Sequence, residues 1–113
     1  AYLECPTGWQ HIAKLVEATL LAEGCNVRQM KEKFGELRVY YFEPDEWDDL
    51  TQDGYEDKIV QIQTLIDIAD HVCQRTCMVC GEKGTLYNES WVGVLCEGHY
   101  NDWRERVYGK KNK

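Results

Sequence analysis

The spacing of four potential metal ligands near the C-terminus constrains this chain more than any other feature. Cys77 and Cys80 form a Cys-x-x-Cys pair followed by glycine, and Cys96 and His99 form a Cys-x-x-His pair after 15 intervening residues. Such pairs reach one ion from two tight turns, and three thiolates with one imidazole are a donor set typical of structural zinc. Four protein ligands close a tetrahedral ion and leave no position for a reactive water. We therefore predict a structural Zn²⁺ site at Cys77, Cys80, Cys96 and His99.

The cysteine count allows one competing interpretation. The chain holds 6 cysteines, and an even number would also suit a disulfide framework. Disulfides do not require a paired pattern that ends in His, so we favour zinc. Cys5, Cys25 and Cys73 are then expected to be free, buried thiols, although Cys73 stays open as a substitute ligand. Because residues 1–10 show no signal peptide and no apolar run reaches membrane-spanning length, we expect a cytoplasmic protein.

The negative charge of the chain is concentrated in one segment. The net charge is -7, and Glu43 to Asp57 holds eight acidic and no basic residues, so the remainder carries +1. We expect a loop or mobile excursion over 43–53, closed by Gly54. Trp47 is either an aromatic interface anchor or a side chain that folds back over the core. The candidate partner-binding residues are Asp45, Glu46, Trp47, Asp48 and Asp49.

Apolar periodicity predicts two helices and a hairpin in the first two thirds of the chain. Residues 9–20 repeat at helical spacing, with Thr7 as the expected cap and Gly24 as the expected end. Strand-like alternation over 37–42 predicts a hairpin from Val27 to Phe42 that turns at Gly35, although 27–33 would also suit a helix face. A long amphipathic helix is expected over 59–73. Trp9, Trp91 and Trp103 lie in periodic segments and are expected in the core.

The C-terminal part is predicted to be a small metal-binding unit. It comprises a knuckle at 77–81, a hairpin over 85–87 and 91–95, and a helix over 97–107, followed by a basic tail at 109–113. This order is that of a treble clef. The predicted fold is thus α+β: a core of two packed helices with a β-hairpin over 1–76, and a treble-clef ββα zinc unit over 77–113 that packs on it as one cooperative domain.

Two further functions were weighed from the residues. Cations beside the rings of Phe34 and Tyr40 would suit single-stranded nucleic acid. Alternating Lys and Glu more often marks a solvated face, and the net charge also argues against this surface. Its candidate residues are Lys31, Lys33, Arg38, Arg104 and Arg106. A treble-clef nuclease would need a His general base on the hairpin at 84–95, which contains none, so we expect no enzyme.

Three stretches together resemble a family of small, mostly uncharacterised zinc-binding proteins of phages and bacteria. They are Gly8-Trp9, the run Lys-Glu-Lys-Phe-Gly-Glu-Leu-Arg at 31–38, and Cys-x-x-Cys-Gly followed by Trp91 and Leu-Cys-x-x-His at 95–99. Glu36 and the long acidic segment depart from that pattern. The resemblance implies zinc at the four ligands and a phage or prophage setting, and it supplies no activity.

The function expected from these observations is a non-catalytic, zinc-stabilised interaction protein. We expect a host protein or complex as its partner, with the acidic segment imitating nucleic acid and so inhibiting a host defence or nucleic-acid-handling complex. The first alternative is a zinc-finger module that binds nucleic acid, and the second, least favoured, is a nuclease.

Overall fold

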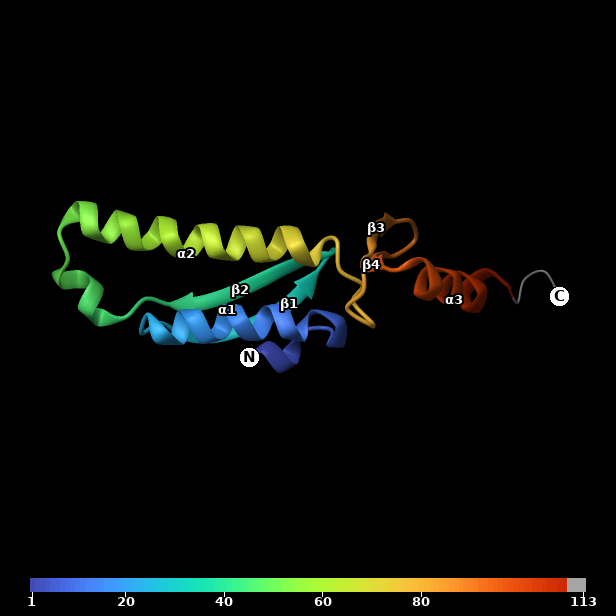
Figure 1. The fold of residues 1–113 in the computed structure, drawn as a ribbon, viewed down its shortest axis with the longest axis horizontal. Coiled ribbons are helices and arrows are strands. Elements are labelled where there is room, and N and C mark those ends of the chain that lie inside the picture. Colours follow the sequence, from blue (N-terminus) through green and yellow to red (C-terminus); the bar gives the residue numbers. More distant parts are fainter. Residues whose placement is uncertain (110–113) are drawn as a thin grey trace.

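The molecule is long and narrow. The computed structural model describes residues 1–109, and it measures 66 × 21 × 20 Å along its principal axes. Figure 1 shows an N-terminal body of two helices and a hairpin, with a smaller hairpin and a third helix continuing along the same axis. Over these residues the fold is α+β, with three α-helices and two antiparallel hairpins, as predicted. The basic tail at 110–113 lies outside the described residues.

The first helix begins later than the sequence indicated. Helix α1 spans Gln10–Ala22, and a short 3-10 helix, Thr7–Trp9, precedes it. Thr7 was predicted as the helix cap, and this is wrong: Trp9 occupies the cap position of α1 and no side chain caps the helix. The predicted end is confirmed, since Gly24 adopts a φ of 85°, in the left-handed region that favours glycine.

The hairpin comprises β1, Asn26–Lys33, and β2, Glu36–Phe42. This confirms the strand alternative for residues 27–33. Phe34 and Gly35 connect the strands with φ values of 55° and 81°, the left-handed backbone of a type I′ hairpin turn. A Cβ at Gly35 would also collide with Leu86 of the C-terminal unit. The positive φ therefore favours glycine at this position, and Gly35 lies against the exposed Leu86 side chain of the C-terminal unit.

The acidic segment is more ordered than a loop. A 3-10 helix, Asp45–Asp49, follows β2, and helix α2 spans Gln52–Cys73. Thr51 caps α2, because its hydroxyl accepts a hydrogen bond from the Gly54 N–H at 3.1 Å. Gly54 thus belongs to the first turn of α2 and does not close a loop, contrary to the prediction.

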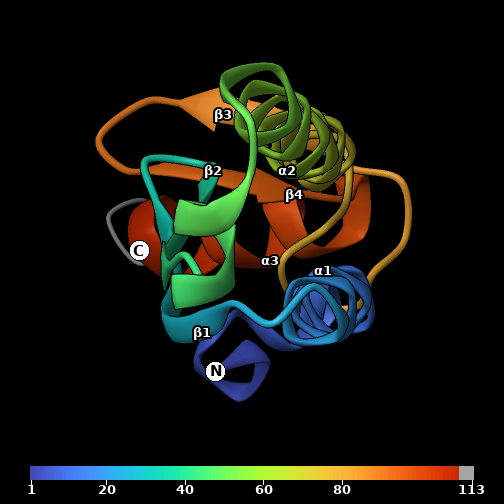
Figure 2. The same cartoon turned by 90° about the vertical axis from the view of Figure 1, so that its left-hand side faces the viewer.

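The core of the body lies between the two helices and one face of the hairpin. Helix α1 packs against α2 and β1, and α2 packs against β2. Figure 2, which looks along the molecule, shows both helices on one side of the β1–β2 hairpin. Met30 and Leu37 point into this core, where they join Trp9, Val16 and Leu20. On the opposite face of the hairpin, the side chains are exposed or half-buried.

The C-terminal unit has the predicted order of a knuckle, a hairpin and a helix. Strands β3, Thr85–Asn88, and β4, Val92–Leu95, pair antiparallel, and helix α3 spans Glu97–Tyr108. Helix α3 has no buried residue and packs on β4. Among the helices of residues 1–109, none has the length and apolar character needed to cross a bilayer.

Candidate functional site

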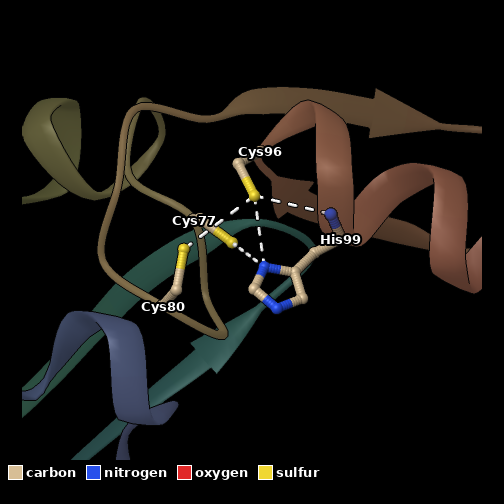
Figure 3. Close-up of side chains that lie close together, drawn as sticks. All are labelled: Cys77, Cys80, Cys96 and His99. Atoms are coloured by element: carbon tan, nitrogen blue, oxygen red, sulfur yellow. Dashed lines mark hydrogen bonds between the residues drawn. The ribbon is translucent and has the colours of Figure 1, made fainter.

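The four predicted metal ligands converge on one point. Cys77 and Cys80 come from the knuckle that follows α2, while Cys96 lies just before α3 and His99 in its first turn (Figure 3). Their ligand atoms, three Sγ and one His nitrogen, all lie within 4.8 Å of one another. The spacing seen in the sequence therefore becomes a single cluster in space, and within the described part of the chain it is the one such group of His, Cys and acidic residues.

The distances within this cluster fit a tetrahedral ion. Metal bonds of about 2.3 Å to sulfur and 2.0–2.1 Å to nitrogen imply tetrahedral edges of about 3.8 Å between sulfurs and about 3.6 Å between sulfur and nitrogen. The Sγ atoms of Cys80 and Cys96 are 3.9 Å apart, and Cys77 Sγ lies 3.6 Å from His99 Nδ1. The edge from Cys96 Sγ to His99 Nδ1 is shorter, at 3.1 Å. The arrangement is compatible with a metal bound through three thiolates and Nδ1.

The protein favours the thiolate form of the most buried ligand. Burial of Cys77 disfavours the charged form, but hydrogen bonds from the backbones of Cys80, Cys96 and Val79 outweigh it. They lower the pKa of Cys77 from 9.0 to about 6. Thiolate is the form that binds a metal.

The start of helix α3 supports the other half of the cluster. Cys96 occupies the cap position of α3, and its Sγ accepts a hydrogen bond from the His99 N–H at 3.5 Å. At Cys80, a backbone hydrogen bond from Glu82 favours the thiolate, but desolvation together with the neighbouring thiols Cys77 and Cys96 outweighs it and raises the pKa. Two thiolates this close repel each other until a cation lies between them.

The remaining cysteines are structural. Cys5, Cys25 and Cys73 are buried free thiols, as predicted. Burial raises the pKa of Cys5 to about 11 and that of Cys73 to about 12. Cys73 was left open as a substitute ligand; it is fully buried in the core of the body and lies outside the metal cluster.

The knuckle that carries Cys77 and Cys80 is pressed against the N-terminal body. The Gly8 N–H donates to the Met78 carbonyl at 2.8 Å, and the indole N–H of Trp9 donates to the Thr76 carbonyl at 2.7 Å. A Cβ at Gly8 would collide with the carbonyl oxygen of Cys77. This contact joins residues about 70 positions apart and was not predicted from the sequence. The Gly8-Trp9 pair marked in the sequence was its one visible signal.

The acidic segment keeps its charges at the surface but not its aromatic side chain. Asp45, Glu46, Asp48 and Asp49 are exposed. Trp47 is only 5% exposed and packs edge-on against Tyr55 as part of the core. The structure therefore shows the alternative in which Trp47 covers the core, and this side chain is not available as an interface anchor.

The cations predicted for nucleic-acid binding fall on two separate surfaces. Lys31 and Arg38 are directly opposite one another on the outward face of the hairpin, and Lys33 follows on the same face. Arg104 and Arg106 belong to α3, and only Arg106 lines a groove of about 820 Å³ beside the metal cluster. The five cations predicted as one set are therefore not brought together.

The outward face of the hairpin pairs cations with aromatic rings. The Lys31 Nζ lies 5.5 Å from the centre of the Tyr40 ring, and the Arg28 guanidinium lies 5.5 Å from that of Phe42. At the turn, Lys33 Nζ lies 5.7 Å from the Phe34 ring. Lys31, Lys33 and the rings of Phe34 and Tyr40 were predicted here from the sequence, whereas the Arg28–Phe42 pair was not.

Two tryptophans predicted in the core line the groove beside the metal cluster instead. Trp91 is 39% exposed, and Trp103 is half-buried. Their rings pack together with centroids 5.6 Å apart. The prediction for Trp91 and Trp103 is wrong because the small unit has too little interior to enclose them; Trp9 is fully buried, as predicted.

No family model, curated protein or solved structure matches this chain. The resemblance to small zinc-binding phage and bacterial proteins therefore stays a prediction. The assignment of a function depends on the geometry of the site itself.

Proposed function

We propose that this chain is a non-catalytic, zinc-stabilised binding protein that takes single-stranded nucleic acid on the outward face of the β1–β2 hairpin. The observation that carries the proposal is the row of three cation–aromatic pairs on that face: Arg28 with Phe42, Lys31 with Tyr40, and Lys33 with Phe34. Rings that stack on bases, flanked by cations that contact phosphates, are how proteins bind single strands with little sequence preference.

The exposure of these rings supports a binding role. Phe34 is 65% exposed, Phe42 62% and Tyr40 44%. Burying a large ring would stabilise the fold, and an exposed ring does not contribute this free energy. An exposed apolar surface surrounded by charged residues is typical of an interaction site. A solvated charged face, the alternative favoured by the Lys and Glu alternation, does not require three rings on the same side.

The charges on this face favour an anionic partner despite the net charge of the chain. The hairpin holds two acids, and both are engaged: Glu36 pairs with Arg38 at 3.2 Å, and Glu32 accepts a hydrogen bond from the Gly35 N–H at 2.8 Å. Within residues 1–109 the cations Arg28, Lys31 and Lys33 make no ion pair. Their charge is free to meet phosphate oxygens.

The metal has a structural role in this proposal. We assign the ion at Cys77, Cys80, Cys96 and His99 as Zn²⁺, because three thiolates with one imidazole at tetrahedral spacing suit zinc. The order of knuckle, hairpin and ligand-bearing helix supports a treble-clef unit. With four protein ligands the ion offers no open position, so it stabilises the unit and its contact with Gly8 without taking part in chemistry.

The test is binding of fluorescently labelled oligo-dT, measured by anisotropy over a range of salt concentrations. We expect affinity to fall as salt rises, because each phosphate contact releases counterions. Replacing Tyr40 with alanine removes one stacking ring and should weaken binding by about 1–3 kcal/mol. Lys31→Gln should weaken binding and reduce the slope of affinity against salt.

Lys14 provides a matched control. Lys14 lies on α1, and its Nζ is 5.8 Å from the ring of Tyr2 in the N-terminal 3-10 helix, so this cation–aromatic pair is not part of the row on the hairpin. Lys14→Gln removes the same charge and the same kind of pair as Lys31→Gln. If both variants lose affinity equally, or the wild-type protein shows no salt-dependent binding, the hairpin face is not a nucleic-acid surface.

A second candidate function rests on the acidic segment. The four exposed acids Asp45, Glu46, Asp48 and Asp49 make no ion pair within the described chain, so they present an uncompensated negative surface. Such a surface supports an inhibitor that imitates nucleic acid and occupies the cationic groove of a host protein, in the phage setting that the resemblance implies. Changing the four acids to Asn or Gln should abolish capture of a nuclease-resistant protein partner from bacterial lysate. Unchanged capture would exclude the mimic.

A further inference from the structure

The groove beside the metal cluster has the features of a binding site. Its volume is about 820 Å³, and its floor is the paired rings of Trp91 and Trp103. Four of the α3 residues that line it, His99, Asp102, Trp103 and Arg106, recur three and four positions apart and so share one face of the helix, and Glu105 lines it beside them.

The outward rings of the hairpin lead toward this groove. A hollow of about 420 Å³ is lined by Glu32, Lys33 and Phe34 from the end of the β1–β2 hairpin and by Ser90, Trp91 and Val92 from the β3–β4 hairpin, so it holds one carboxylate and one cation. Trp91 lines both this hollow and the groove. Phe34 therefore borders the same hollow as Trp91, and Trp91 packs beside Trp103 in the groove, while Tyr40 and Phe42 line a separate hollow farther along the hairpin.

The polar residues that line the groove suit two different contacts with a nucleic acid, one with a phosphate and one with a base. Arg106 supplies a cation next to the tryptophans, as Lys33 does next to Phe34. Asp102 and Glu105 supply carboxylates that would repel a phosphate. The Asp102 carboxylate makes no hydrogen bond or ion pair in the part of the chain that the structure describes. A free carboxylate beside stacking rings can accept hydrogen bonds from the amino group of a base such as cytosine.

We propose that the Trp91–Trp103 groove is the second half of the nucleic-acid track, so that one strand crosses from the hairpin face onto the metal-binding unit. This inference rests on the proposed function of the hairpin face. A base stacks on Trp91, Arg106 contacts the backbone phosphate, and Asp102 accepts a hydrogen bond from the exocyclic amino group. The metal then supports binding indirectly, because it holds β4 and α3 in place under the track.

The length dependence of binding tests the proposal. We expect the affinity of the wild-type protein for oligo-dT to rise with oligonucleotide length until the strand spans both surfaces. Trp91→Ala should bind short oligonucleotides like the wild type and long ones about 5- to 150-fold more weakly, the equivalent of about 1–3 kcal/mol for one stacked base. Metal content and melting temperature are measured alongside. Asp102→Asn, at an exposed position, should remove a preference for oligo-dC over oligo-dT.

Two neighbouring arginines provide a matched pair. Arg104→Gln and Arg106→Gln remove the same charge from the same helix, but only Arg106 lines the groove. We expect Arg106→Gln to weaken binding of long oligonucleotides severalfold more than Arg104→Gln. If all these variants bind every length as the wild type does, the groove is not part of the track, while the hairpin function stands. If the wild-type protein binds no oligonucleotide, the proposed function fails and this inference fails with it.

Discussion

Replacing Gly8 with alanine should weaken metal binding although Gly8 is not a ligand. The added Cβ would collide with the carbonyl oxygen of Cys77 and would lie 2.7 Å from Gly81 N and 2.8 Å from the carbonyl carbon of Met78. All three are backbone atoms of the knuckle, so no side-chain rotation relieves the contact. Either the N-terminal turn or the knuckle must move.

The size of the effect follows from the cost of overpacking. Inserting one methyl group against backbone atoms that cannot move aside costs about 1–3 kcal/mol. Displacing the turn also strains the hydrogen bond from the Gly8 N–H to the Met78 carbonyl, and such a bond contributes about 0.5–1.5 kcal/mol. If the knuckle moves, Cys77 and Cys80 shift relative to Cys96. Strain of about 1–3 kcal/mol in the bound state lowers affinity about 5- to 150-fold.

The assay is competition for Zn²⁺ against a chromophoric chelator at fixed pH, together with thermal unfolding of the metal-saturated protein followed by circular dichroism. Gly98→Ala is the matched control. Gly98 lies between Cys96 and His99, yet a Cβ there would meet nothing within 4 Å. Neither Gly8 nor Gly98 has a positive φ, so alanine is conformationally allowed at both, and the comparison isolates the steric contact.

We expect Gly98→Ala to bind metal as the wild type does and to melt at the same or a slightly higher temperature, because alanine is the better helix former by at most about 1 kcal/mol. Gly8→Ala should bind metal more weakly and melt lower. If Gly8→Ala matches Gly98→Ala in both measurements, the N-terminal turn does not press on the knuckle, and the metal unit is not coupled to the body through it.

Two further predictions concern the metal and the buried thiols. Removing the metal with a chelator should unfold at least residues 77–107, because α3 has no buried residue to hold it; unchanged helix content and melting by circular dichroism would contradict this. Cys73 should resist alkylation in the native protein near pH 8, since burial raises its pKa from 9.0 to about 12, and labelling of Cys73 in the native protein, read by mass spectrometry, would overturn the argument. Because the pKa of Cys73 is higher in the folded than in the unfolded protein, its contribution to the stability of the fold is fully present below pH 9 and is lost as the pH rises toward 12. The melting temperature of the wild type should therefore fall between pH 9 and 12. In Cys73→Ala the fall, measured from the variant's own melting temperature at neutral pH, should be smaller.

Much of the local structure follows from the sequence. The four metal ligands are identified by spacing, because a Cys-x-x-Cys turn can place two thiols on one ion without reference to the rest of the fold. The strand pattern of β2 and the left-handed turn at Gly35 are likewise local, as alternation and turn chemistry depend on neighbouring residues. Periodicity also located α1 and the last four turns of α2, but the first two turns of α2, from Gln52, were not predicted.

The tertiary structure decided which surface each side chain reaches. Trp47 lies among acidic residues, yet packing against Tyr55 and the core buries it. Trp91 begins an apolar strand segment, yet the small interior of the C-terminal unit leaves it exposed. The pairing of Arg28 with Phe42 depends on strand register. The contact of Gly8 with Cys77 joins distant parts of the chain. Local patterns depend on a few adjacent residues and can therefore be read from the sequence. Burial, strand register and long-range contacts depend on the fold of the whole chain.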